Sequence, residues 1–274
     1  MKNTSTEEAA SINRRSFLTR ATLMGGAALL PFAGLARAGQ NPTKDNDDDK
    51  DHDRDKSGIG KGDRAIIIAA EIAEALAVTT YTNIINTSPF FGGLSVNDQV
   101  YLTAALQEEM SHYLVEESVT GQPTPYTKFY FPASMFTDPQ TTLNILVTLE
   151  DAFIAAYLVG VRNFSTADLR VTAARIMGIE SDHRSLARVI AADLNLPTVT
   201  GAQGVAEEVN PANNNGYERT LKWTSISQAV AALTPFVDVT AAGNAGFDTN
   251  VSFDFVPFTP TLPTPLGDFI SFGG

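Results

Sequence analysis

Two stretches of the sequence, "LQEEMSHYLVEE" (residues 106–117) and "GIESDHRSLARVI" (residues 178–190), share one spacing. In each stretch a glutamate precedes a histidine by three positions, and the chain has only one further histidine, His52. Residues three apart on a helix lie on neighbouring turns, so both side chains can reach one ion. A glutamate falls at this spacing by chance in about one case in twenty. The repeat therefore predicts two related pairs, Glu109 with His112 and Glu180 with His183.

Long apolar segments around these stretches predict four helices. They cover roughly residues 64–85, 95–118, 139–163 and 165–194. N-cap signals precede the last three: Ser95 with Asp98, Asp138 with Pro139, and Ser165 with Asp168. Short connections predict two antiparallel hairpins, whereas the middle connection, residues 119–138, is long and contains three prolines. The sequence thus predicts an all-α four-helix bundle with one long crossover.

An internal repeat selects the acidic residues of the first and third helices. Glu74 is followed seven residues later by Tyr81, and Glu150 seven residues later by Tyr157. Seven residues are almost two helical turns, so each glutamate shares a face with its tyrosine. Glu71, the other candidate on the first helix, has no such match. The two hairpins therefore carry the same pattern, and Glu74 and Glu150 are the expected partners of the two glutamate and histidine pairs.

These six side chains are expected to form one layer inside the bundle. At about 1.5 Å of rise per residue, the four glutamates lie about 20 Å from the same end of their helices. Buried carboxylates without partners are costly, and two divalent cations would neutralise four of them. The chain has no cysteine, so a metal would have only oxygen and imidazole ligands. The alternative is a buried hydrogen-bond network without metal. Tyr81 and Tyr157 are expected as core residues, and Glu108, Glu116 and Glu117 as solvated helix surface.

The combined pattern resembles the ferritin-like superfamily over residues 64–194, whose bundles are also wired as two hairpins with a long crossover. The resemblance implies two Fe ions, or alternatively two Mn ions. It implies that Glu109 and Glu180 bridge the two metals. It also implies that Glu74 and Glu150 each cap one metal, and that His112 and His183 each ligate one metal.

The N-terminus is similar to a twin-arginine export signal. Residues 1–38 contain adjacent Arg14 and Arg15, a short apolar run interrupted by glycine and proline, and a small-residue cleavage pattern ending at Ala38. We expect export to the periplasm or cell surface, and no stable membrane span after signal cleavage. Together with "LEDAFIAAYLVGV" (residues 149–161), the signal resembles exported ferritin-like proteins related to desiccation-associated proteins.

The segments flanking the bundle have distinct compositions. Residues 39–63 are dense in charge and predict a disordered acidic tether. The tether's alternating aspartates resemble a calcium loop but lack its glycine and its final glutamate. Residues 195–244 predict a loop and a fifth helix over 223–236, and residues 245–274 an extended tail rich in Phe and Pro. The tail either lies on its own bundle or engages an envelope partner or a second copy, which would make a homo-oligomer.

The sequence leaves three functions open. The first is a di-iron protein that uses dioxygen or peroxide to oxidise Fe(II) or a small substrate. The second is a di-manganese enzyme that consumes peroxide, as catalases do, and the third is a metal-free envelope scaffold associated with stress or desiccation. A nucleic-acid partner is not expected, because the net charge is −12. Storage of iron in a hollow cage is disfavoured by the long extensions on either side of the bundle.

Overall fold

The computed structural model describes residues 59–209 and 221–261. The predicted signal peptide, most of the predicted tether and residues 262–274 of the predicted tail lie outside these ranges. The aspartates that resemble a calcium loop, and His52, also lie outside them.

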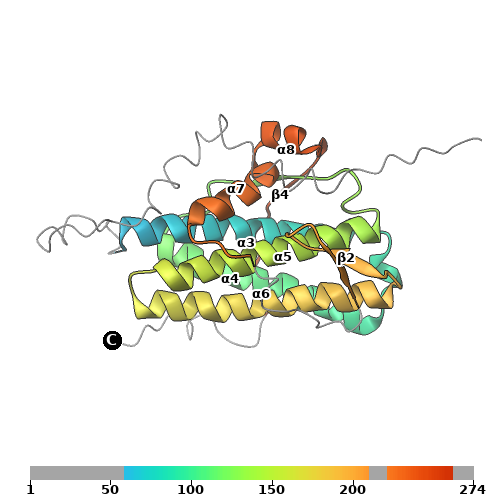
Figure 1. Cartoon of the computed structure of the whole chain (residues 1–274), viewed down its shortest axis with the longest axis horizontal. Coiled ribbons are helices and arrows are strands. Elements are labelled where there is room, and N and C mark those ends of the chain that lie inside the picture. The colour runs from blue at the N-terminus through green and yellow to red at the C-terminus, as the bar shows by residue number, and fades with distance from the viewer. Residues whose placement is uncertain (1–58, 210–220, 262–274) are drawn as a thin grey trace, which may run out of the picture.

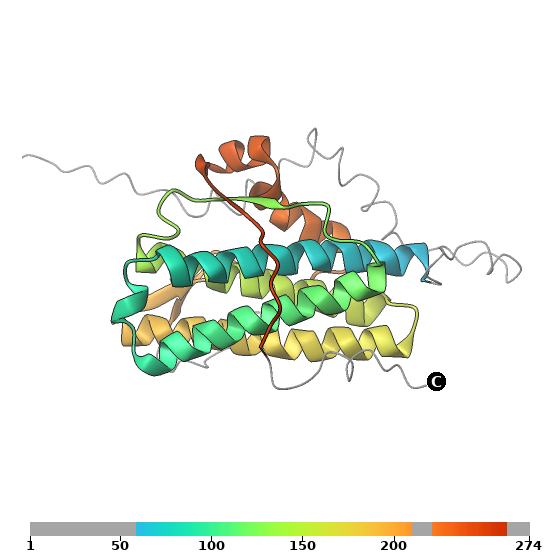
Figure 2. The same cartoon turned by 180° about the vertical axis from the view of Figure 1, so that it is seen from behind.

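Four long helices form the body of the molecule (Figures 1 and 2). They are α3 (Lys61–Thr87), α4 (Val96–Thr120), α5 (Pro139–Asn163) and α6 (Ala167–Asp193). The connection between α3 and α4 contains only the short 3₁₀ helix η1 (Phe91–Gly93), and α5 and α6 are joined by three residues. Because α3 packs mainly on α4 and α5 on α6, the molecule is built from two hairpins. The predicted helical bundle is confirmed.

Most of the predicted helix starts are seen in the structure. The Asp138 side chain accepts a hydrogen bond from the Thr141 backbone N–H at 2.9 Å, with Pro139 as the first residue of α5. Ser95 accepts from the Asp98 N–H at 3.1 Å and caps α4. These caps satisfy backbone donors that the first helical turn leaves unpaired.

The start of α6 differs from the prediction. Its N-cap is Thr166, whose hydroxyl accepts from the Leu169 N–H at 3.3 Å, and Ser165 is not the cap. Ser165 instead donates from its backbone N–H to Asp63 at 2.9 Å, and its hydroxyl also bonds the Asp63 carboxylate. Asp63 is buried, and α3 begins at Lys61. The last three residues of the predicted tether are therefore helical.

The helices α3 and α5 form the centre of the molecule. By length and composition each could cross a membrane, but 83% and 72% of their most apolar segments are buried inside the fold. Their apolar character is accounted for by the core, because a helix that is hydrophobic on most of its circumference must be covered on most sides.

The crossover and the C-terminal region cover one side of this centre. Strand β1 (Lys128–Phe131) lies in the crossover and pairs antiparallel with β4 (Asp248–Asp254), while α7 (Ile226–Val237) and α8 (Val239–Ala245) pack nearby. After β4 the chain runs across α3 and α4 (Figure 2). There the Phe255 ring lies 4.7 Å from that of Tyr113. The fifth helix was predicted; α8 and the strand pair were not. The described part of the tail lies on its own chain.

A second short hairpin fastens α5 to α6. Strands β2 (Thr198–Thr200) and β3 (Ala206–Glu208) pair antiparallel. Glu207 of β3 accepts from Arg184 at 2.7 Å and also from the fully buried Arg188, and Arg184 bonds Asp151 of α5 as well. The sequence carries no local signal for this network, because its acidic members lie far from the two arginines along the chain.

We expect Glu207→Gln to destabilise the fold by about 3 kcal/mol, because it leaves two buried guanidinium groups without their shared carboxylate. Urea unfolding followed by circular dichroism measures the change. Glu208→Gln, at the exposed neighbouring position, is the control and should differ little from the parent protein. Equal stability of the two variants would contradict the role of this network.

Candidate metal centre

The structure brings all six predicted residues together in the middle of the bundle. Each of the four helices contributes, and α4 and α6 contribute twice because the three-residue spacing places glutamate and histidine on one face. Glu109, Glu150 and Glu180 are 0% exposed, Glu74 is 1% exposed and His183 is 3% exposed. The side chain of His112 is 12% exposed and is the most accessible of the six.

The six side chains form two groups that overlap. One contains Glu74, Glu109, His112 and Glu180, and the other contains Glu109, Glu150, Glu180 and His183. Within each group, one candidate ligand atom per residue lies within 4.8 Å of all the others. Glu109 and Glu180 belong to both groups, which is the arrangement that two carboxylates shared between two ions require.

The imidazole nitrogens face the carboxylates directly. His112 Nδ1 lies 3.2 Å from Glu180 Oε1 and 3.6 Å from Glu74 Oε2. His183 Nδ1 lies 2.7 Å from Glu109 Oε1 and 3.6 Å from Glu180 Oε2. In both histidines the same ring nitrogen, Nδ1, therefore points into the cluster.

The donor set of this cluster fits metal ions. Eight buried oxygen and nitrogen atoms of the six side chains have no hydrogen bond of suitable geometry, although several lie close together. Buried polar atoms are normally satisfied, so a concentration of unsatisfied ones at one point indicates a missing partner. Carboxylate oxygens and neutral imidazoles are ligands for iron, manganese and other first-row divalent ions. The cluster can hold a metal ion.

Each tyrosine of the internal repeat bonds the glutamate of the other hairpin. Tyr81 of α3 donates to Glu150 of α5 at 2.7 Å, and Tyr157 of α5 bonds Glu74 of α3. The hydroxyls are thus satisfied, as expected for core tyrosines. The crossed pairing holds one oxygen of Glu74 and of Glu150 in place, so the other oxygen of each is available to a metal.

Two glutamates expected on the solvated surface contact the site instead. Glu108 bonds His183 Nε2 at 2.8 Å, and Glu116 accepts from the Tyr157 hydroxyl at 2.7 Å. Glu116 is buried, whereas Glu108 is 37% exposed. Both lie four residues from His112 and so share its helix face, a signal that was present in the sequence. Glu117 is only partly buried.

Glu71, which does not match the internal repeat of glutamate and tyrosine, lies outside the centre. It lies one turn before Glu74 and accepts from the Thr120 hydroxyl at 3.3 Å. Burial, opposed in part by this hydrogen bond, raises the pKa of Glu71 to about 7.

The electrostatics show how strongly the cluster attracts positive charge. Burial and the neighbouring carboxylates raise the pKa of Glu74 and of Glu150 well above the ordinary value. Burial alone would lower the pKa of His112 and His183, but the carboxylates outweigh it and hold both pKa values well above their usual range. Without metal, protons therefore supply the positive charge, and a metal bound at Nδ1 must displace them.

The described residues thus form a four-helix bundle with a buried layer of carboxylates and imidazoles that can hold a metal ion. The family model of the ferritin-like domain matches residues 62–193. These residues belong to the ferritin-like family, as their pattern predicted. Comparisons with curated proteins and with solved structures found no match.

Glu71 gives a prediction for the dependence of stability on pH in the metal-free protein. Its folded-state pKa of about 7 exceeds the ordinary 4.5, so the folded state binds more protons between these values and loses stability as pH rises through them. Glu71→Gln removes this loss. We expect the variant to be more stable than the parent at pH 8, with an advantage that shrinks towards pH 4.5.

Thermal unfolding at several pH values measures this difference, with the exposed Glu208→Gln as the control. An advantage of Glu71→Gln that is independent of pH would show that the buried carboxyl does not titrate in this range.

Proposed function

We propose that the protein binds two iron ions in this cluster and uses them to oxidise Fe(II) or a small substrate with dioxygen or peroxide. The observation that carries the proposal is the sharing of Glu109 and Glu180 by both groups of candidate ligands. Two ions of charge +2 would balance the four buried carboxylates, which a single ion would not.

Each side chain has a distinct part in this proposal. Glu109 and Glu180 would bridge the ions, Glu74 and Glu150 would each bind one ion, and His112 and His183 would each provide Nδ1 to one. The bound iron would supply one-electron chemistry with oxygen species. Glu108 would fix the ring of His183 by accepting its second N–H, a contact that orients metal-bound histidines and makes them better ligands.

Iron is favoured by the chemistry of the donor set. Carboxylates are hard ligands that suit iron and manganese, and the two imidazoles shift the preference towards iron. Manganese with the same six residues would give the peroxide-consuming alternative. The near-complete burial of the carboxylates keeps bulk water away from the ions, so the charges of the site act at close range with little screening.

We also propose that the protein acts outside the cytoplasm. The twin-arginine pattern around Arg14 and Arg15 favours export of the folded protein to the periplasm or cell surface. That route transports folded proteins, so iron bound before export would remain enclosed by the bundle. Fusion of residues 1–38 to a folded reporter tests this step independently of the metal.

Metal loading tests the central claim. The purified protein is incubated anaerobically with Fe(II) or with Mn(II), desalted and analysed for metal by mass spectrometry. We expect about two iron ions per chain, a raised melting temperature, and loss of both effects in Glu109→Ala. Glu71→Gln, one turn from Glu74, should bind iron as the parent does.

The outcomes separate the alternatives. Iron uptake followed by oxidation with dioxygen or peroxide supports the proposal. Retention of manganese with rapid peroxide consumption would assign the manganese chemistry instead. If neither metal is retained and neither changes the melting temperature, the cluster is a metal-free hydrogen-bond network and the proposed function is wrong.

A further inference from the structure

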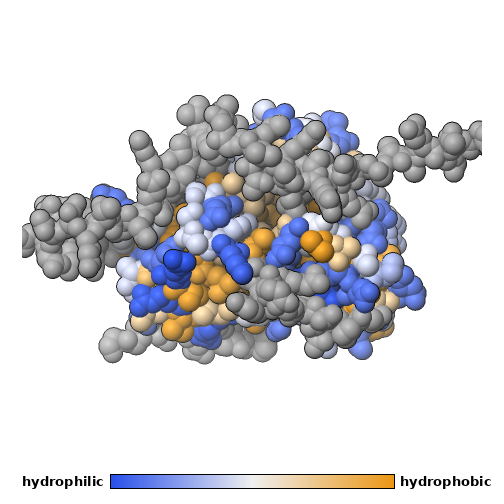
Figure 3. Space-filling view, viewed as in Figure 1, coloured by the Kyte–Doolittle hydropathy of each residue, from blue (hydrophilic) through white to orange (hydrophobic). Residues whose placement is uncertain are grey.

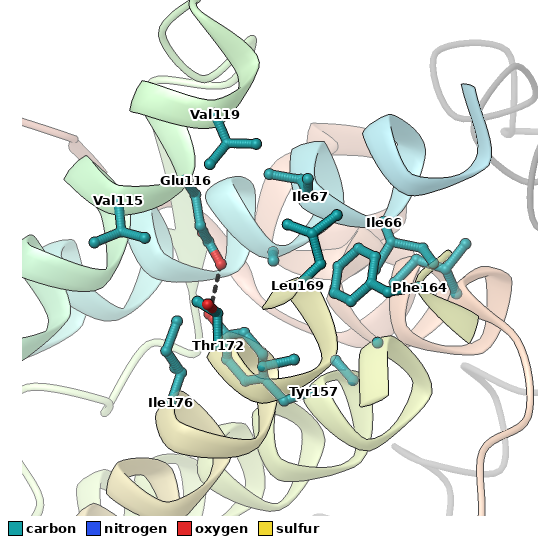
Figure 4. A pocket seen from close by; sticks show the side chains of 15 residues that line it. Ile66, Ile67, Val115, Glu116, Val119, Tyr157, Phe164, Leu169, Thr172 and Ile176 are labelled. Carbon is teal, nitrogen blue, oxygen red and sulfur yellow. Dashed lines mark hydrogen bonds between the residues drawn. The ribbon is translucent and has the colours of Figure 1, made fainter. Parts of the chain in front are cut away.

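A small apolar pocket lies beside the centre, between the two hairpins. It is lined from all four bundle helices and from Ile226 of α7. Figure 4 shows its walls, which include Ile67, Val115, Leu169 and Ile176. Small residues, among them Ala70, Ala156 and Ala173, leave the space open.

The pocket ends one side chain away from the metal centre. Its polar floor is the hydrogen bond between Glu116 and Tyr157, drawn in Figure 4. The same Tyr157 hydroxyl bonds Glu74, a candidate ligand in the group that contains His112. A molecule in the pocket would therefore contact Tyr157, whose hydroxyl bonds a candidate metal ligand.

The mouth of the pocket lies between α4 and α6. Val119, Leu169 and Thr172 are partly exposed, whereas Val115 and Ile176 are buried deeper along the same two helices. Figure 3 shows apolar surface gathered over the C-terminal end of α5 and the N-terminal part of α6.

Size and polarity select what the pocket can hold. Its volume of about 40 Å³ admits a molecule of a few atoms. Hydrogen peroxide has two donors and two acceptors, and leaving them unpaired against apolar walls is unfavourable. Only Glu116, Tyr157 and Thr172 offer side-chain polar groups there. Dioxygen has no hydrogen bonds to lose.

We infer that this pocket is a holding site for dioxygen on its way to the centre. The inference rests on the proposed function and narrows it, because it makes dioxygen the oxidant that reaches the centre through this pocket. It assigns Ala156 and its neighbours on the pocket wall to oxygen access, and Tyr157 to the boundary between the pocket and the metal ligands.

Xenon is a suitable probe, because this apolar atom occupies dry cavities whether or not a metal is bound. Crystals of the purified protein are pressurised with xenon, and its anomalous signal is located. We expect a xenon site against Ala156, and loss of that site in Ala156→Leu. Ala192→Leu, a half-buried alanine on α6 outside the pocket, is the matched control and should keep it.

Stopped-flow oxidation of the iron-loaded protein provides the second measurement. Ala156→Leu should lower the second-order rate constant for dioxygen several-fold and leave the rate with peroxide unchanged. Thr172→Leu, at the partly exposed mouth of the pocket, should also lower the rate constant for dioxygen. This variant replaces Ala156→Leu if circular dichroism shows that Ala156→Leu folds poorly.

Two results would overturn the inference. One is the absence of xenon from the pocket of the parent protein. The other is an unchanged dioxygen rate in pocket variants that have lost the xenon site. Failure of the proposed function is distinguishable, because it appears as absence of iron uptake, while the xenon site can be measured in the metal-free protein.

Discussion

The whole structure depends on the confinement of four carboxylates in one apolar layer. Glu74, Glu109, Glu150 and Glu180 are almost completely buried and so close that their negative charges repel strongly. Such a layer persists only if positive charge enters it, as protons on the histidines or as metal ions. The long helices, the tyrosine hydroxyls and the apolar core hold these groups where that compensation is needed. The packing of the helices must therefore overcome the electrostatic repulsion between these four carboxylates.

The two hairpins repeat each other in sequence and pair crosswise in space, yet the centre is not symmetric. Both additional acidic contacts, Glu108 and Glu116, come from α4. The corresponding positions on α6 are Ile179 and Ala187, which cannot make these contacts. One half of the centre thus has a carboxylate behind its histidine, and the other half faces the apolar pocket. Two ions held here would have different surroundings, and a small molecule would approach the half that contains His112.

Local signals in the sequence were sufficient for the helices and for the six central residues, because spacing along a helix fixes which side chains share a face. These local signals were not sufficient where a residue's environment depends on a partner far away in the sequence. Ser165 and Thr166 are equally good caps locally, and only the contact of Ser165 with Asp63 decides between them. Glu116 is polar and was read as surface, but Tyr157 of the other hairpin buries it. Strand pairing between the crossover and the C-terminal region likewise has no local signature.

The pairing of β1 with β4 also has a consequence for biosynthesis. Phe129 in the crossover lies opposite Phe253, which is made more than a hundred residues later. A contact of such long range forms late, because the intervening chain must first be ordered. As the chain leaves the ribosome, the aromatic side of the crossover stays uncovered until strand β4 has been synthesised. A chaperone would have its longest opportunity to bind at this side of the crossover.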